Sequence, residues 1–203
     1  MPVQLPADNR NQKDKVILGI DPGTNIMGFG VIHILNRKMQ MRDLGVIRME
    51  KIGDPAGKLK AIFENTLALV DKHLPDEFAI ESPFFGKNVQ SMLKLGRAQG
   101  VAIAAALIRN IPVFEYSPKK IKMSITGNGN ASKEQVAIML QQLLILQELP
   151  DFLDATDGLA TAVCHHFQNG QAGGNGKKYG SWNSFLTANS ERQLTSSRKP
   201  KKN

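Results

Sequence analysis

Acidic residues at the ends of apolar segments are the part of this sequence that most plainly offers chemistry. The apolar run at residues 16–20 stops at Asp21, and the run at 78–80 stops at Glu81. A carboxylate at the end of a buried strand is costly unless it is paired or holds a cation. Both positions therefore call for a functional explanation.

Two further acids, Asp154 and Asp157, are three residues apart and share one face near the start of a predicted helix, where the helix dipole stabilises negative charge. Helix capping explains Asp151 but leaves Asp21 and Glu81 unexplained. Carboxylates from two strand ends and a helix, in a chain with only four His and one Cys, are typical of a Mg²⁺ or Mn²⁺ site. Two such ions about 4 Å apart can activate a water and stabilise the leaving oxygen of a phosphodiester.

The charges of the chain are segregated along the sequence. Residues 86–133 contain eight Lys or Arg and one acid, Glu115, whereas residues 134–167 contain five acids and no Lys or Arg. A basic surface beside an acidic cluster suits an enzyme that grips a polyanion and cuts it with metal ions. Two solvated helix faces of opposite sign are the alternative.

The elements that must position these acids follow from local signals. Strands are predicted at 16–20, 27–35 and 39–48 as an antiparallel meander, and then at 78–81 and 111–116. Helices are predicted from Asp54-Pro55 onward, at 88–108, 118–125 and 151–167, and from a capping box of Ser132 and Gln135 to about 146. This order predicts an α/β fold with a mixed five-stranded sheet and helices on both faces. Right-handed crossovers would place the first and fourth strands side by side, which would bring Asp21 and Glu81 together.

One helical segment has small residues at every fourth position, Gly96, Gly100 and Ala104. For this stripe we favour packing within the chain, with helix-on-helix dimerisation as the alternative. The lone Cys164 lies in an apolar run, which indicates a buried structural thiol and a reducing, cytoplasmic setting. His165 and His166 fall about two helical turns beyond Asp157, so we interpret them as structural.

Three regions are expected from composition. Residues 1–14 form a polar, disordered extension, 15–168 form one globular domain, and 169–203 form a basic, disordered tail that carries +6 of the net charge of +8. No apolar stretch approaches the roughly 20 residues of a membrane span. We therefore expect no membrane partner.

Several motifs, in collinear order over about residues 15–167, resemble the RuvC family of Holliday junction resolvases. They are ILGIDPGT at 17–24, GFGV at 28–31, AIE at 79–81, Lys87-Asn88, LKLGRAQGVA at 93–102, VFEY at 113–116 and DATDGLA at 154–160. The resemblance implies a ribonuclease H-like fold and a homodimer that cleaves four-way DNA junctions symmetrically in recombination and DNA repair. It also implies handover from the RuvA and RuvB branch-migration proteins.

The resemblance also implies roles for individual residues. Asp21, Glu81, Asp154 and Asp157 match the four catalytic carboxylates, which hold two Mg²⁺ ions or substituting Mn²⁺, with Asp21 bridging both metals. The residues expected to contact DNA are the aromatic near the crossover and four basic residues: Phe84, Lys87, Arg97, Lys122 and Lys133.

Phe84-Phe85 follows Glu81 in a loop, and we assign base stacking to Phe84 and packing to Phe85. Ser82-Pro83 departs from the family pattern after the catalytic Glu. Gly158 stands where Ala is common in the family, at a helix cost of about 1 kcal/mol, and would permit close backbone approach.

Other readings of these motifs remain open. The turn at 21–24 resembles the phosphate loop of sugar kinases and actin-like ATPases, but those folds need two such domains and do not demand Asp154 and Asp157. A ribonuclease acting on RNA·DNA hybrids would share the fold. A junction-binding protein without catalysis is disfavoured because all four acids are present.

Overall fold

The computed structural model describes residues 14–36, 38–83, 88–148 and 153–172, with side chains described as far as 168. Five strands form one sheet in the order β3-β2-β1-β4-β5. The strands are β1 (Lys15–Asp21), β2 (Ile26–Leu35), β3 (Lys38–Arg48), β4 (Glu77–Glu81) and β5 (Val113–Tyr116). Strands β1 to β3 form an antiparallel meander, and β1, β4 and β5 pair in parallel. The predicted mixed sheet is confirmed, as is the pairing of the first and fourth strands.

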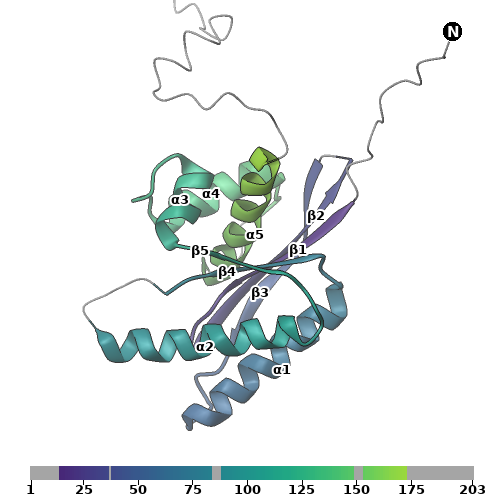
Figure 1. The fold of residues 1–203 in the computed structure, drawn as a ribbon. Helices are drawn as coiled ribbons and strands as arrows, with labels where there is room; N and C mark the ends of the chain where they lie inside the picture. The colour runs from purple at the N-terminus through teal and green to yellow at the C-terminus, as the bar shows by residue number, and fades with distance from the viewer. Residues whose placement is uncertain (1–13, 37, 84–87, 149–152, 173–203) are drawn as a thin grey trace, which may run out of the picture. The chain divides into compact units, whose positions relative to one another are not determined.

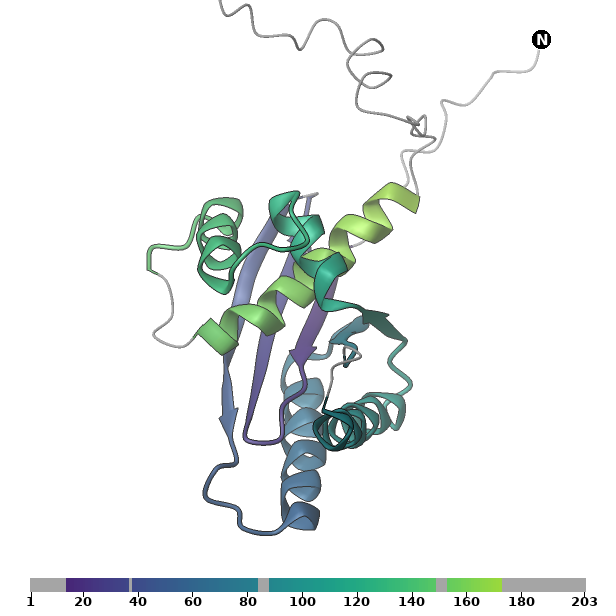
Figure 2. The ribbon, with the colours of Figure 1, turned by 90° about the vertical axis from the view of Figure 1, so that its left-hand side faces the viewer.

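Helices cover both faces of the sheet, as Figures 1 and 2 show. The side chains of β1 alternate: Ile17 packs toward one core cluster, and Leu18 and Ile20 pack toward the other. The Leu18 cluster is closed by α1 (Pro55–His73) and α2 (Val89–Leu107). The Ile17 cluster is closed by α3 (Pro118–Thr126), α4 (Lys133–Leu144) and α5 (Leu153–Ala172).

Most of the helix starts follow the predicted signals. The side chains of four N-cap residues accept hydrogen bonds from backbone N–H groups three residues on: Asp54, Asn88, Ser117 and Ser132. Ser132 and Gln135 form the predicted capping box. The predicted ends are less accurate: α4 stops at Leu144 because Ile145 takes a left-handed conformation (φ 53°), and α5 continues beyond 167 to Ala172.

Helix α5 lies against glycines of the sheet at unusually close range. A Cβ atom added at Gly158 would lie 2.5 Å from Cα of Phe29, and one added at Gly30 would lie 2.6 Å from N of Leu159. On β1, a Cβ atom at Gly19 would lie 2.5 Å from N of Ala162. The close backbone approach expected at Gly158 is therefore confirmed, and it seats the first turns of α5 directly on β1 and β2.

The small-residue stripe of α2 behaves differently from our expectation. A Cβ atom added at Gly96 or Gly100 would meet no described atom within 4 Å, so the favoured packing within the chain is wrong for these two glycines. Exposed Leu93 and Leu107 lie on the same helix, with 58% and 54% of their surface accessible. Cys164 is fully buried, as predicted. In the described part of the chain, every helix is too short or too polar to cross a membrane.

Candidate active site

Acids from three elements meet beside one small pocket. Asp21 ends β1 and Glu81 ends the adjacent parallel strand β4, and strand alternation turns both toward the face covered by α5. The pocket has a volume of about 190 Å³ and is lined by these two acids, by Asp157, and by Lys122 and Lys133. Three of the four predicted carboxylates and two of the predicted basic residues are thus brought together.

The fourth acid, Asp154, joins the group through a lysine. The ammonium nitrogen of Lys133 lies 3.0 Å from Oδ1 of Asp154 and 2.5 Å from Oδ2 of Asp157. The geometry has a local cause, since the Ser132 cap starts α4 at Lys133 while Asp154 and Asp157 share one face of the first turns of α5. One ammonium group therefore bridges both aspartates.

Burial and mutual repulsion leave the other two acids poorly stabilised as anions. Burial, followed by the charge of Asp157, raises the pKa of Asp21 to about 7 against the lowering effect of Lys133. Burial and the charge of Asp21 raise the pKa of Glu81 to about 8. Burial also raises the pKa of Asp157, opposed by its hydrogen bond from Lys133. If all three were ionised, these acids would carry more negative charge than the two pocket lysines neutralise.

This arrangement has the chemistry of a site for a hard cation. Carboxylate oxygens are the ligands that Mg²⁺ and Mn²⁺ prefer, and the ammonium group of Lys133 already occupies a cation position between Asp154 and Asp157. Partial burial opposes its charge, but the hydrogen bonds to Asp157 and Asp154 raise the pKa of Lys133. Among the described residues, no three Asp, Glu, His or Cys side chains stand close enough together to form a metal-binding cluster. A divalent ion held by both Asp154 and Asp157 would take the place that the Lys133 ammonium group now occupies between them.

The remaining predicted contacts are scattered. Arg97 lines a different pocket, on the face covered by α1 and α2. Phe84 and Lys87 lie outside the described residues, as do Phe85 and Asp151. The structure thus brings Lys122 and Lys133 to the acids and leaves Arg97 apart from them.

A buried hydrogen-bond chain fixes α5 behind the acids. The hydroxyl of Tyr116 lies 2.6 Å from Nδ1 of His165, and Nε2 of His165 lies 2.7 Å from Oε2 of Glu77. The Lys15 ammonium donates to the other Glu77 oxygen at 2.6 Å. His165 therefore ties α5 to β4 and β5, and Glu77 extends the chain to Lys15 on β1, in keeping with a structural role for His165.

Sequence reasoning missed two features of the site. It assigned Lys133 to DNA and did not foresee its bridge to Asp154 and Asp157. It also gave no structural role to Gly19, Gly28 and Gly30, which make room for α5. The Gly-x-Gly spacing at 28–30 places both glycines on one strand face, which is the signal that was available.

The similarity to known proteins extends over the whole region that contains the four acids. The family model described as crossover junction endodeoxyribonuclease RuvC matches residues 17–165. A protein of that name from Christiangramia forsetii is 59% identical over 178 residues, covering 88% of this chain and 92% of the relative. Another from Cytophaga hutchinsonii is 56% identical over 182 residues, covering 90% of each chain.

Solved structures give the same result. Thermus thermophilus RuvC in complex with a Holliday junction substrate aligns with a TM-score of 0.72 and 30% identity, covering 78% of this chain and 96% of that one. The yeast mitochondrial Holliday junction resolvase Ydc2 aligns with a TM-score of 0.53 at 16% identity, which shows a shared fold. The predicted ribonuclease H-like fold is confirmed, and the chain belongs to the RuvC family of crossover junction endodeoxyribonucleases.

Proposed function

We propose that this protein resolves four-way DNA junctions by hydrolysing one phosphodiester at each of two symmetric positions. The observation that carries the proposal is the convergence of Asp21, Glu81 and Asp157 with Lys122 and Lys133 on one pocket. The names of the relatives and the junction-bound Thermus thermophilus neighbour support it.

In this proposal the four carboxylates of Asp21, Glu81, Asp154 and Asp157 hold two Mg²⁺ ions, for which Mn²⁺ can substitute. Bound there, the ions would supply an activated water and stabilise the leaving oxygen. The raised pKa values of Asp21 and Glu81 support the assignment, because a cation would offset both the burial and the mutual repulsion that raise them. Asp21, which lines the same pocket as Glu81 and Asp157, would be the carboxylate shared by both ions.

The lysines of the pocket act on the substrate. Lys122 and Lys133 would pair with the phosphate oxygens next to the cut, holding that phosphodiester over the acids. To do so, Lys133 must exchange its present contacts with Asp154 and Asp157 for contacts with DNA. Its charge would then balance the negative charge that develops in the transition state.

Paired cuts need two active sites, and we propose that a homodimer supplies them. Support comes from α2, whose Gly96 and Gly100 are open and whose Leu93 and Leu107 are exposed. A helix-on-helix contact along this stripe would bury these leucines. We further propose that RuvA and RuvB deliver the junction, as the family resemblance implies.

The Asp21→Asn variant tests the mechanism. We expect it to bind a synthetic four-way junction about as well as the wild type and to cut it at least about 100-fold more slowly. The measurement is cleavage of an end-labelled mobile junction with Mg²⁺, with the positions of both nicks mapped. Undiminished Mg²⁺-dependent cutting by this variant would refute the assignment of Asp21.

The same assay separates the main alternative. The wild type should cut junctions in preference to linear duplex and to RNA·DNA hybrid. Rapid degradation of the hybrid with the junction left intact would instead favour a ribonuclease. Junction binding by the wild type without any Mg²⁺-dependent cleavage would favour a non-catalytic binding protein.

A further inference from the structure

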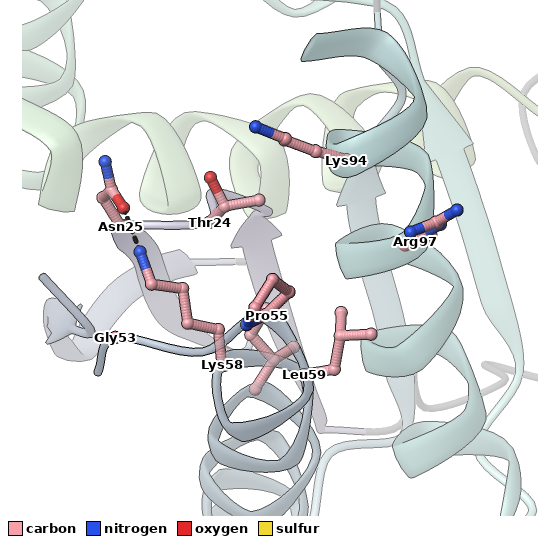
Figure 3. A pocket seen from close by; sticks show the side chains of 9 residues that line it. Thr24, Asn25, Gly53, Pro55, Lys58, Leu59, Lys94 and Arg97 are labelled. Atoms are coloured by element: carbon pink, nitrogen blue, oxygen red, sulfur yellow. Dashed lines mark hydrogen bonds between the residues drawn. The ribbon is translucent and has the colours of Figure 1, made fainter. Parts of the chain in front are cut away.

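A second pocket lies at the same end of β1 as the acid pocket but on the opposite face of the sheet (Figure 3). Its volume is about 370 Å³. It is bordered by the turn after β1 at Thr24 and Asn25, by the first turn of α1, and by the first half of α2. Thr24 is only three residues beyond Asp21, so both pockets adjoin the same short stretch of backbone.

The lining of this second pocket is strongly basic. Lys58, Lys94 and Arg97 line it, and its lining includes no acid. Figure 3 shows Lys58 rising from α1 and Lys94 reaching out from α2, both toward the turn at Thr24 and Asn25. Cationic side chains that line one pocket without an acid create a positive potential that would attract an anion.

The existing partners of these side chains leave their charges largely uncompensated. The Lys58 ammonium donates to Oδ1 of Asn25 at 2.6 Å, which is a contact with a neutral amide. No acid among the described residues forms an ion pair with Lys94 or Arg97. The nearby Asp54 is occupied as the cap of α1, where it accepts from N of Gly57. The pocket is therefore arranged to receive negative charge from outside the chain.

The rest of the lining narrows the class of ligand. Pro55 and Leu59 contribute apolar surface beside the cationic groups. A nucleic-acid backbone presents that combination, because each anionic phosphate is flanked by largely apolar sugar faces. A DNA strand that crossed the end of β1 would contact this pocket on one face of the sheet and the acid pocket on the other face.

We propose that this pocket binds a backbone phosphate of the junction DNA at a distance from the phosphodiester that is cut. The inference rests on the proposed junction-resolving function and adds a substrate contact that lies outside the acid pocket. Lys58 and Lys94 make the contact, and the contact fixes the path of the strand across the end of β1.

Neutral variants in the Asp21→Asn background test the contact without cleavage. Lys58→Gln and Lys94→Gln keep long side chains and remove the charge. Lys60→Gln is the matched control, since Lys60 lies on the same helix and forms only an exposed pair with Glu64 at 3.7 Å. Arg97 is left intact because it also lies on the exposed side of α2 that we propose for dimerisation.

The measurement is junction affinity by fluorescence anisotropy over a range of NaCl concentrations. Each pocket variant should weaken binding roughly three- to tenfold at about 0.1 M salt and lower the slope of log K against log salt by about 0.9, one phosphate contact. Lys60→Gln should leave both unchanged. If both pocket variants showed the same junction affinity and salt slope as Lys60→Gln, the pocket assignment would be overturned. Junction cleavage by the wild type would be unaffected by that result.

A second comparison adds charge in place of removing it. A Cβ atom at Gly53 would meet no described atom within 4 Å, so the first side-chain atom of either Ser or Asp has room at the pocket edge. Gly53→Asp should weaken junction binding and Gly53→Ser should not. If the Asp21→Asn protein without a pocket substitution does not bind four-way junctions in preference to linear duplex, the proposed function itself is wrong.

A free inorganic anion could bind the same cationic groups in place of a DNA phosphate. Inorganic phosphate, titrated calorimetrically at constant ionic strength, should bind far more weakly than the junction. Saturable phosphate binding that Lys58→Gln and Lys94→Gln abolish, with junction affinity unchanged, would overturn the DNA assignment in favour of a small-anion site.

Discussion

Lys133 holds Asp154 and Asp157 with a single ammonium group, so a divalent cation has to compete with it. Replacing it by Gln removes the competitor. We expect Lys133→Gln to bind Mn²⁺ a few-fold more tightly, because partly exposed ion pairs of this kind are worth up to about 1 kcal/mol. Isothermal titration calorimetry without DNA measures this directly.

The rate of junction cleavage by Lys133→Gln should fall, although its affinity for Mn²⁺ rises. Loss of a positive group aimed at the reacting phosphate should slow cutting roughly 100-fold at saturating Mg²⁺. Lys120→Gln is a suitable control, because its ammonium group lies over the ring of Tyr116 and Lys120 is not part of the acid pocket lining. Weaker Mn²⁺ binding by Lys133→Gln would contradict the idea that Lys133 occupies the cation position.

Asp21 should lower the stability of the protein at neutral and alkaline pH. Its folded-state pKa of about 7 lies above the ordinary value of 3.8, so the folded chain holds this proton more tightly than the unfolded chain. Stability contributed by the protonated form is therefore lost as pH rises through this interval. Asp21→Asn should raise the free energy of unfolding at pH 8 by on the order of 1 kcal/mol or more, and the gain should vanish near pH 4.

Urea unfolding in EDTA at the two pH values measures this effect. Glu64→Gln, which alters an exposed acid on α1, should show no comparable gain at pH 8. A loss of stability in Asp21→Asn at pH 8 would mean that the carboxylate is stabilised by contacts that outweigh its burial.

The acids themselves were predictable from sequence because each occupies a position that local structure does not explain. Asp21 and Glu81 end apolar strands, and Asp154 and Asp157 have helical spacing. The bridge made by Lys133 was not predictable, because it depends on the distance between two helices that are separate in the sequence.

At the scale of elements, the close seating of α5 on the glycines of β1 and β2 sets the position of the acids. Gly30→Ala would place a Cβ atom 2.6 Å from both N and Cβ of Leu159. We expect a loss of roughly 1–3 kcal/mol in the free energy of unfolding, together with slower cleavage, because α5 must shift to relieve the overlap. Thermal unfolding and the junction assay measure the two effects.

Gly53→Ala is the control for that substitution, since its Cβ atom would meet no described atom within 4 Å. It should leave stability unchanged or slightly improved. Wild-type stability and cleavage in Gly30→Ala would show that α5 is less closely seated than the structure has it.

Element boundaries followed from the sequence wherever a cap or turn residue marked them. Asp54, Asn88, Ser117 and Ser132 all start helices at or next to the expected positions. The end of α5 was missed because the residues after 167 are polar and lack apolar periodicity. The function of the sheet glycines was missed because a glycine shows only that space is available, and the element that fills it lies far along the chain.

At the scale of the whole molecule, the exposed stripe of α2 is the proposed contact between two copies. Leu107→Glu would place a charge at one end of the proposed apolar interface, and we expect it to shift the protein toward a monomer. Sedimentation analysis measures the mass, and nick mapping should show that cuts on the two strands lose their coupling. Ile138→Glu is a matched control, since Ile138 is similarly exposed at 48% but lies on α4.

A dimeric Leu107→Glu protein with coupled cuts would move the proposed contact away from α2. The sequence left the stripe of Gly96, Gly100 and Ala104 open between internal packing and dimerisation. Only the folded chain shows that no described part of it covers Gly96 or Gly100, because coverage depends on where every other element lies.

The lysine bridge between Asp154 and Asp157 also links two binding events. A cation that displaces Lys133 frees an ammonium group for a phosphate, and a phosphate that attracts Lys133 vacates the aspartates for a cation. Metal and DNA should therefore bind with positive coupling, and each must tighten the other by the same factor. An enzyme away from its substrate would then hold its ions weakly, and the junction itself would complete the hydrolytic centre.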